Sequence, residues 1–407
     1  MFSRHLIFFG IFAAIFLFVA LLFFEVRENN IEVRPPGENI LSVPEAGSKD
    51  KKASNSPVVS DIESQKPLPN PPSVIKAIYL TSWSGGSSKK INYAIDLKKA
   101  GLINAVVVDI KDFSGIVAYD IQNPDVIKYG AKEIRIPKIN LTIKKLHDEG
   151  IYVVARITVF QDPVLATARL DLAVKSSSSM IAASTLGTNS LWKDRKGLSW
   201  IDPAATSSWD YFVAIGKDAA SRGFDELNFD YIRFPSDGDL NDMLFPHWDE
   251  ITPKHKVIKK FFKYLRGSLP NVKISADLFG LATVNKGDMG IGQIIEDAYE
   301  YFDYVSPMVY PSHYATGFLG YVNPATAPYE VVKYSLDGAF ARLKSTSTII
   351  FTSKLRPWLQ DFDLGADYNE AMVELEIQAV KDALGGDYNG FMLWNPSNIY
   401  TKEALHE

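Results

Sequence analysis

The chain has 407 residues, of which 46% are hydrophobic and 22% charged, a composition that excludes a wholly disordered or collagen-like protein. Its 43 Lys and Arg residues face 48 Asp and Glu residues, so the formal net charge is −5. Because no basic excess is present to neutralise phosphates, we expect no nucleic-acid partner. The chain has no cysteine, which excludes disulfides, thiol catalysis and thiolate metal sites.

The first 28 residues contain a long apolar run. Residues 6–24 carry no charge and would form a helix of roughly 28 Å, close to the hydrocarbon thickness of a bilayer. The alternative is a cleaved signal peptide, but its apolar region usually spans only about 7–15 residues and is followed by small residues. Here the run ends in bulky side chains, and the positive Arg4 precedes it. We therefore predict that residues 1–28 are a cytoplasmic tip and a transmembrane signal anchor in the cell membrane, with the remaining chain extracytoplasmic.

Residues 29–73 are rich in Pro, Ser, Lys, Glu and Asn and show no apolar period. This composition is typical of a solvated, semi-extended chain. We predict a disordered tether over 29–73 that separates the membrane anchor from a folded domain over 74–407.

Eight short runs of β-branched and aromatic residues follow the tether. They begin at Val74, Ala105, Ile151, Asp225, Lys273, Tyr304, Thr348 and Gly390. Each gap leaves room for a crossover helix, which indicates parallel strands, and helix-like stretches occur over 89–100, 140–149, 207–222 and 253–265. The pattern predicts an α/β fold, a (β/α)8 TIM barrel, with an insertion over about 161–202 above its mouth. The alternative is a doubly wound open sheet, which the absence of a Gly-rich phosphate-binding loop after the first run disfavours.

Two aspartates lie near the carboxyl ends of neighbouring predicted strands, where TIM barrels place their chemistry. Asp230 interrupts an apolar run, and Asp277 occurs in the next one. Adjacent strands lie about 4.8 Å apart, so the two carboxylates can converge as glycoside hydrolysis requires. We predict Asp230 and Asp277 as catalytic residues. The alternatives are a structural ion pair for Asp230 and a helix cap for Asp277.

Further polar and aromatic residues occur at the same predicted strand ends, and we expect them to bind substrate. They are Asp109, Lys111, Arg156, Asn228, Arg233, Tyr310, Trp358, Asp361 and Trp394. Asp109 and Lys111 have the same parity along their strand and are expected to point the same way. Lys111 and Arg156 would form an electrostatic frame for Asp230, and Asp109 and Asp361 are reserve candidates for the proton donor.

Several tryptophans fall at predicted strand ends or in the insertion, and their flat faces suit sugar rings, although Trp is also a common core residue. They are Trp83, Trp192, Trp200, Trp358 and Trp394. The six histidines show no short metal-ligand spacing, so we expect no metal and no cofactor. The absence of a G-x-S-x-G motif weakens an esterase interpretation.

Five segments together resemble a known family. They are GFDELNFDYIRFPSDG, ISADLFG, YVSPMVYPSHY, LRPWLQDF and GFMLWNPSN. Over residues 74–398 the chain resembles the bacterial putative glycoside hydrolase domain family, a TIM-barrel family. The resemblance implies a polysaccharide substrate and export to the membrane or cell wall.

A more distant resemblance is to α-amylase-like and α-galactosidase-like barrels, which place a nucleophilic Asp at the end of strand four. Asp230 stands at that position in this chain. The proton donor of those families has no match, because strand five here offers Asp277 instead of Glu and strand six offers Tyr310.

The sequence thus predicts a membrane-anchored glycoside hydrolase that cleaves a cell-wall or other extracellular polysaccharide with a pair of carboxylates. Two alternatives remain open at this point. One is a non-catalytic carbohydrate-binding barrel at the cell surface, and the other is a scaffold in which the anchor and tether matter more than the barrel mouth.

Overall fold

The structure is a computed structural model that describes residues 60–179, 190–345 and 351–406. The predicted transmembrane segment and most of the predicted tether lie outside these residues. Within the described ranges, no helix is both long enough and apolar enough to cross a membrane.

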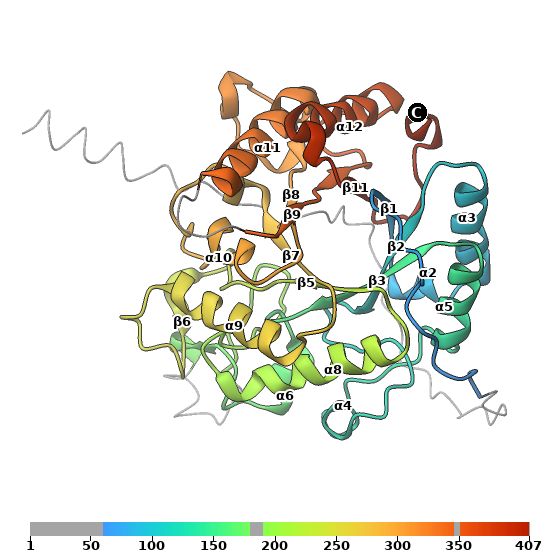
Figure 1. Cartoon of the computed structure of the whole chain (residues 1–407). Coiled ribbons are helices and arrows are strands. Elements are labelled where there is room, and N and C mark those ends of the chain that lie inside the picture. The colour runs from blue at the N-terminus through green and yellow to red at the C-terminus, as the bar shows by residue number, and fades with distance from the viewer. Residues whose placement is uncertain (1–59, 180–189, 346–350, 407) are drawn as a thin grey trace, which may run out of the picture.

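The core of the fold is a closed barrel of eight parallel strand positions, with helices around it (Figure 1). In barrel order, the strands are β1 (Ile75–Leu80), β2 (Ala105–Lys111), β3 (Tyr152–Thr158), β5 (Glu226–Asp230), β7 (Ile274–Phe279), β8 (Tyr304–Met308), β9 (Lys354–Leu355) with β10 (Trp358–Gln360), and β11 (Gly390–Trp394). Strand β11 pairs with β1, and β8 pairs with both β9 and β10, which closes the barrel. The predicted (β/α)8 fold is confirmed.

The seventh strand is predicted to begin at Thr348, which lies outside the described residues, and the described part of that run, from residue 351, is divided. The structure places two short strands there, β9 and β10, with Arg356 and Pro357 between them. Proline has no backbone N–H to donate to a neighbouring strand, and this accounts for the interruption at Pro357.

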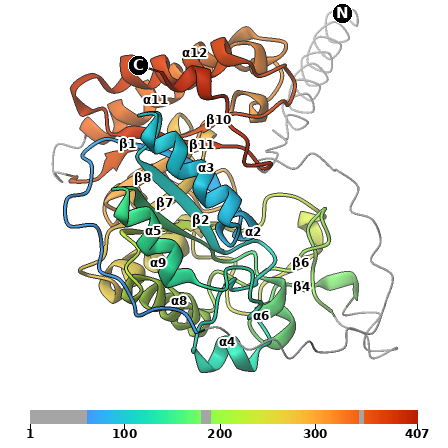
Figure 2. The same cartoon turned by 90° about the vertical axis from the view of Figure 1, so that its right-hand side faces the viewer.

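The helices cover the outside of the barrel, as Figure 2 shows for α3 and α5 beside β1 and β2. They are α2 (Ser82–Gly85), α3 (Ser88–Lys99), α4 (Pro124–Lys128), α5 (Ile139–Asp148), α6 (Pro163–Ala168), α8 (Trp209–Ser221), α9 (Lys254–Ser268), α10 (Ile295–Tyr299), α11 (Pro328–Lys344) and α12 (Glu370–Leu384). Four of them, α3, α5, α8 and α9, agree with the predicted helical stretches to within three residues at each end. In α5 the buried side chains Ile139, Ile143 and Leu146 recur at helical spacing and form its barrel-facing side.

Alternate residues of each strand face the barrel interior, because side chains in a strand alternate between its two faces. On β1, Ile75 and Tyr79 belong to the inner apolar cluster, whereas Ile78 and Leu80 belong to the outer cluster beneath the helices. Strand β5 departs from this apolar pattern, since its alternate residues Glu226, Asn228 and Asp230 are all polar and buried. The interior of the barrel therefore carries a polar column along β5.

The polar column begins with a buried ion pair at the amino-terminal end of β5. The guanidinium of Arg356 binds the carboxylate of Glu226, which also accepts a hydrogen bond of 3.2 Å from the hydroxyl of Tyr152. Both charged side chains are fully buried. Asn228 and Asp230 follow Glu226 along the column, toward the barrel mouth.

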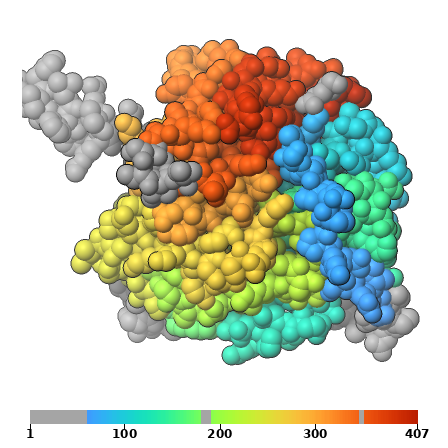
Figure 3. Space-filling model, viewed as in Figure 1, coloured from blue at the N-terminus to red at the C-terminus, as the bar shows by residue number. Residues whose placement is uncertain are grey.

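Residues 60–73 correct the predicted extent of the disordered tether. This segment lies along the outside of the barrel in Figure 3 and forms specific hydrogen bonds with it. The carboxylate of Asp61 accepts hydrogen bonds from the backbone N–H groups of Asn140 (2.7 Å) and Leu141 (3.1 Å) at the start of α5. Further along, the N–H of Leu68 donates to Asp225 at 2.6 Å. The segment thus caps a helix that has no side-chain cap of its own.

The described part of the predicted insertion packs against the loop that follows β5. Its short strand β4 (Lys175–Ser176) pairs antiparallel with β6 (Met243–Leu244) of that loop. Trp192 and Trp200 are buried in this region, and their indole N–H groups donate to Asp239 and Asp194. These two tryptophans support the insertion and do not offer a face to a ligand.

Candidate active site

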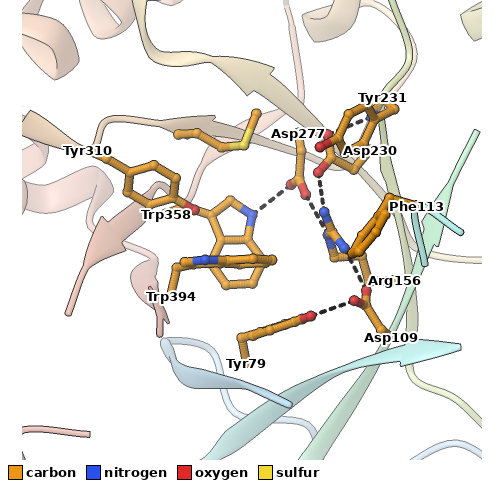
Figure 4. Close-up of a pocket in the computed structure, with 11 residues that line it drawn as sticks. Tyr79, Asp109, Phe113, Arg156, Asp230, Tyr231, Asp277, Tyr310, Trp358 and Trp394 are labelled. Atoms are coloured by element: carbon orange, nitrogen blue, oxygen red, sulfur yellow. Dashed lines mark hydrogen bonds and ion pairs between the residues drawn. The ribbon is translucent and has the colours of Figure 1, made fainter. Parts of the chain in front are cut away.

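A small pocket lies at the carboxyl ends of the strands. Figure 4 shows its walls. The lining residues are Tyr79, Asp109, Phe113, Arg156, Asp230, Tyr231, Asp277, Met308, Tyr310, Trp358 and Trp394. They come from most of the strand positions of the barrel and from the loops that follow them.

Arg156, on β3, is at the electrostatic centre of the pocket (Figure 4). Its Nη1 donates to Oδ1 of Asp109 at 2.6 Å, its Nη2 binds Oδ2 of Asp230, and its Nε lies 3.7 Å from Oδ2 of Asp277. All four side chains are almost completely buried. A single cation therefore faces three carboxyl groups, so the full charge of all three cannot be compensated within the cluster.

Asp230 is the last residue of β5, at the upper end of the polar column. Besides its ion pair with Arg156, its Oδ1 accepts a hydrogen bond of 2.5 Å from the backbone N–H of Tyr231. Tyr231 has a φ of 53°, a left-handed conformation that is unfavourable for an aromatic residue. Backbone strain of this kind is concentrated at functional sites, and here it helps to direct an N–H at the carboxylate.

Asp277 lies within β7 and caps no helix. Its Oδ1 accepts hydrogen bonds of 2.8 Å from both Asn228 and the indole N–H of Trp358, whereas its Oδ2 accepts none within the described structure. Burial, reinforced by the negative charge of Asp230, raises the pKa of Asp277 well above its ordinary value. Asp277 is therefore suited to carry a proton, and its Oδ2 is the position for that proton.

Asp109, on β2, completes the cluster. Its Oδ2 accepts a hydrogen bond of 2.5 Å from the hydroxyl of Tyr79, and its Oδ1 binds Arg156. Burial raises its pKa to about 6, although the charge of Arg156 opposes this shift. Asp109 thus orients Arg156 and is itself oriented by Tyr79.

Aromatic side chains form the opposite wall of the pocket. Tyr79 and Trp394 stack with ring centroids 3.9 Å apart, and Trp358 meets Trp394 edge to face at 5.6 Å. The guanidinium carbon of Arg156 lies 5.0 Å from the ring of Trp394. The buried Tyr310 completes this wall, so flat apolar faces stand beside the carboxylates.

Four predicted site residues lie outside the pocket lining: Lys111, Asn228, Arg233 and Asp361. Asn228 still contributes to the site, because it donates a hydrogen bond to Asp277. Lys111 is the clearest correction. The pairing of β2 with β3 shifts between Asp109 and Lys111, so the two side chains do not share a direction despite their parity. Lys111 is buried and forms an ion pair of 2.9 Å with Asp162. Lys111 and Arg156 are both predicted to place a positive charge next to Asp230, but in the structure only Arg156 does so among the residues that line the pocket.

Arg233 and Asp361 also occupy structural positions. The guanidinium of Arg233 lies among aromatic rings. Its carbon atom is 4.6 Å from the ring centre of Phe279 and 4.8 Å from the ring centre of Trp200. Asp361 accepts hydrogen bonds from the backbone N–H and the hydroxyl of Thr401. Asp361 is absent from the pocket lining and lines a neighbouring surface hollow instead.

Four lining residues were not among the predicted site residues: Tyr79, Phe113, Tyr231 and Met308. Tyr79 could have been identified, because it continues the inward-facing parity of Ile75 and Ala77 to the end of β1. Phe113 follows β2 in a loop, where no periodicity indicates the direction of a side chain. Among the described residues, no group of three or more His, Asp or Glu side chains is arranged to hold a metal ion.

The barrel with its buried acidic pocket has the architecture of a glycoside-hydrolase-type TIM barrel. Residues 77–400 match the family described as a putative glycosyl hydrolase domain, and the chain belongs to that family. No curated protein sequence matches the chain significantly.

Solved structures also resemble the chain. A hypothetical protein from Ruminiclostridium thermocellum ATCC 27405 is 39% identical, covering 49% of this chain and 96% of the other, with a TM-score of 0.43. The glycoside hydrolase domain of PgaB (BpsB) from Bordetella bronchiseptica is 14% identical over 80% of this chain and 95% of the other, with a TM-score of 0.57. The glycoside hydrolase domain of PelA from Pseudomonas aeruginosa is 12% identical over 81% of this chain and 97% of the other, with a TM-score of 0.40. The similarity to PgaB supports the fold.

Proposed function

We propose that the protein is a glycoside hydrolase that cleaves O-glycosidic bonds with Asp230 and Asp277. The observation that carries the proposal is the unequal environment of two carboxyl groups beside one guanidinium. Asp230 binds Arg156 directly, whereas Asp277 lies 3.7 Å from it and has a raised pKa because of burial and the Asp230 charge. A carboxyl group that holds its proton, next to a carboxylate that binds a guanidinium, supplies an acid and a base in one pocket.

In this mechanism, Oδ2 of protonated Asp277 donates its proton to the glycosidic oxygen as the bond to the anomeric carbon breaks. In one route the Asp230 carboxylate attacks the anomeric carbon, and water then breaks the glycosyl–Asp230 bond, gives its hydroxyl group to the sugar and returns a proton to Asp277. In the other route Asp230 takes a proton from the water that attacks the anomeric carbon, and exchange with solvent then removes this proton from Asp230 and restores the proton of Asp277. Arg156 holds the Asp230 carboxylate through an ion pair, and Asn228 and Trp358 orient Asp277 through its other oxygen.

We further propose that the substrate is an extracellular or cell-wall polysaccharide and that the protein acts at the cell membrane. The support for membrane anchoring is the uncharged run over residues 6–24, and the support for a saccharide is the family and the aromatic wall. A tether that begins near residue 29 and docks on the barrel from residue 60 would hold the pocket outside the bilayer.

A carbohydrate-binding barrel without turnover is the second candidate, and one specific observation favours it. Both carboxylate oxygens of Asp230 already accept hydrogen bonds, from Arg156 and from the N–H of Tyr231. A nucleophile so fully engaged would have to give up one of these partners, or act with a remaining lone pair.

The test is the release of reducing ends from a panel of bacterial envelope polysaccharides and exopolysaccharides. The wild type is compared with Asp230→Asn and Asp277→Asn, and Asp337→Asn on the exposed side of α11 is the matched control. We expect release by the wild type and the control and a loss of at least 100-fold in each pocket variant. If the wild type binds a glycan from the panel and releases nothing, the protein is the binding barrel instead.

A further inference from the structure

An exposed tryptophan stands beside the barrel mouth and is held more firmly than a surface side chain usually is. Trp83 lies in α2, the short helix that follows β1, and 61% of its surface is exposed. Single exposed apolar side chains are common and carry no meaning alone. The surroundings of Trp83 are what distinguish it.

One face of the indole is covered by a fixed cation. The guanidinium carbon of Arg135 lies 5.2 Å from the centre of the Trp83 ring. Arg135 in turn donates to Asp112 at 2.5 Å, to Glu133 at 3.1 Å and to the hydroxyl of Ser82 at 3.2 Å. The guanidinium is therefore anchored at several points, and it supports the ring from one side.

The backbone of α2 is fixed as well. Two glycines allow it to pack directly against the segment that contains Arg135, since a Cβ on Gly86 would lie 1.9 Å from the carbonyl oxygen of Arg135. A Cβ on Gly85 would lie 2.7 Å from the side chain of Val108 on β2. The hydroxyl of Thr81 also accepts a hydrogen bond from the N–H of Ser84 and caps the helix. The tryptophan is thus presented on a rigid support.

The same support connects Trp83 with the pocket. Asp112, which anchors Arg135, is followed directly by Phe113, an aromatic residue that is 40% exposed and lines the pocket. The hydroxyl of Ser82, next to Trp83, is 3.4 Å from the Asp112 carboxylate. Trp83 therefore follows β1 and Phe113 follows β2, and the ion pair of Asp112 and Arg135 in the second segment contacts the first through Ser82 and Trp83.

We propose that Trp83, supported by Arg135, is the stacking platform of a remote subsite that binds a sugar unit of a glycan chain extending from the pocket past Phe113. This inference rests on the proposed function for the identity of the ligand, and it deepens that proposal. Trp83 is not part of the pocket lining, so a rigid aromatic face there adds affinity only for a chain that extends beyond the pocket. The substrate class is therefore an extended polysaccharide, recognised on several sugar units.

The test uses oligosaccharides of increasing length, prepared from the panel polysaccharide that the wild type binds most tightly. Their dissociation constants are measured by calorimetry in the Asp230→Asn background, so that cleavage does not interfere. Trp83→Ala is compared with Trp83→Phe and with Tyr334→Ala, a control at a side chain of similar exposure (48%) on α11. Thermal unfolding of each variant verifies that it is folded.

We expect Trp83→Ala to weaken the binding of long oligosaccharides about tenfold and to leave the shortest bound ligand unchanged. Trp83→Phe should retain most of the affinity, and Tyr334→Ala all of it. Equal affinities of Trp83→Ala and its parent at every length would overturn the inference, and so would the binding of no glycan by the parent. A failure of the hydrolase proposal would look different. The wild type would then release no reducing ends, while the length-dependent binding through Trp83 would persist.

Discussion

The ion cluster makes a quantitative prediction for Arg156→Met, which keeps much of the side-chain volume and removes the charge. Arg156 contacts Asp109 and Asp230 directly and lies 3.7 Å from Asp277, and all are buried. Removing one partner of a buried ion pair typically costs about 3–5 kcal/mol, because the remaining charge is left uncompensated. We expect the free energy of unfolding to fall by that amount at pH 7.5, a large part of the roughly 5–15 kcal/mol of a typical domain.

The same variant should recover stability in acid. Without the cation, the folded-state pKa values of Asp109 and Asp277, which burial already raises, move further above their unfolded values, starting from about 6 for Asp109. A carboxyl group with a raised folded-state pKa binds its proton more tightly in the folded state than in the unfolded state. It therefore does not lower the free energy of unfolding below its unfolded-state pKa, and it lowers that free energy as the pH rises through its folded-state pKa. The deficit of Arg156→Met relative to the wild type should therefore be smaller at pH 5 than at pH 7.5.

Urea unfolding of the two proteins at both pH values measures this deficit. Arg169→Met is the control, because Arg169 pairs with Asp171 on the surface, where an ion pair contributes about 1 kcal/mol or less. A deficit below 1 kcal/mol at pH 7.5, or one that does not change with pH, would refute the view that Arg156 compensates buried carboxylates.

Three further predictions concern individual carboxylates. Asp61→Ala should lower the free energy of unfolding by about 1–2 kcal/mol, because two N–H groups at the start of α5 lose their hydrogen-bond acceptor. Asp148→Ala, at the exposed end of α5, is the control, and an equal or larger effect of this control would contradict the prediction. Asp109→Asn should flatten the pH dependence of stability. A carboxyl group whose pKa rises from 3.8 to about 6 on folding lowers the free energy of unfolding of the wild type by about 2 kcal/mol between pH 4.5 and 7.5. Identical pH profiles of stability for the two proteins would exclude this pKa shift. The hydrolytic kcat should stay high to a pH well above the ordinary pKa of an aspartate, because Asp277 remains protonated there, and a decline already complete by pH 5 would contradict that assignment.

The positions of the catalytic candidates could be predicted because they depend on strand order and parity alone. Asp230 ends β5, and Asp277 lies in the neighbouring strand β7. Arg156 lies in β3, on the other side of β5, where it is paired with Asn228. Parallel strands bring such residues to one rim regardless of the loops between them. The division of roles between the two aspartates required the structure, because it depends on which oxygen accepts which hydrogen bond.

The errors occurred where a local irregularity overrides the regular period. The register shift after Asp109 turns Lys111 away from the pocket, and a one-residue irregularity of this kind leaves no signal in the amino-acid pattern. Residues 60–73 were assigned to a disordered tether because an extended segment held by single hydrogen bonds, such as those of Asp61 and Leu68, has no apolar period. Its partners on α5 and before β5 are distant in sequence and could not be identified without the fold.

The most direct test of the proposed carboxylate pair varies the leaving group of the substrate. Aryl glycosides of the sugar identified by the panel have leaving groups that need little or no protonation, so a variant that lacks the proton donor should recover on them. We predict that Asp277→Asn loses at least 100-fold in kcat on the polysaccharide and regains most of its activity on an aryl glycoside with an acidic phenol, whereas Asp230→Asn stays inactive on both. Equal losses for the two variants on both substrates would contradict the assignment of Asp277 as the acid and Asp230 as the nucleophile or base.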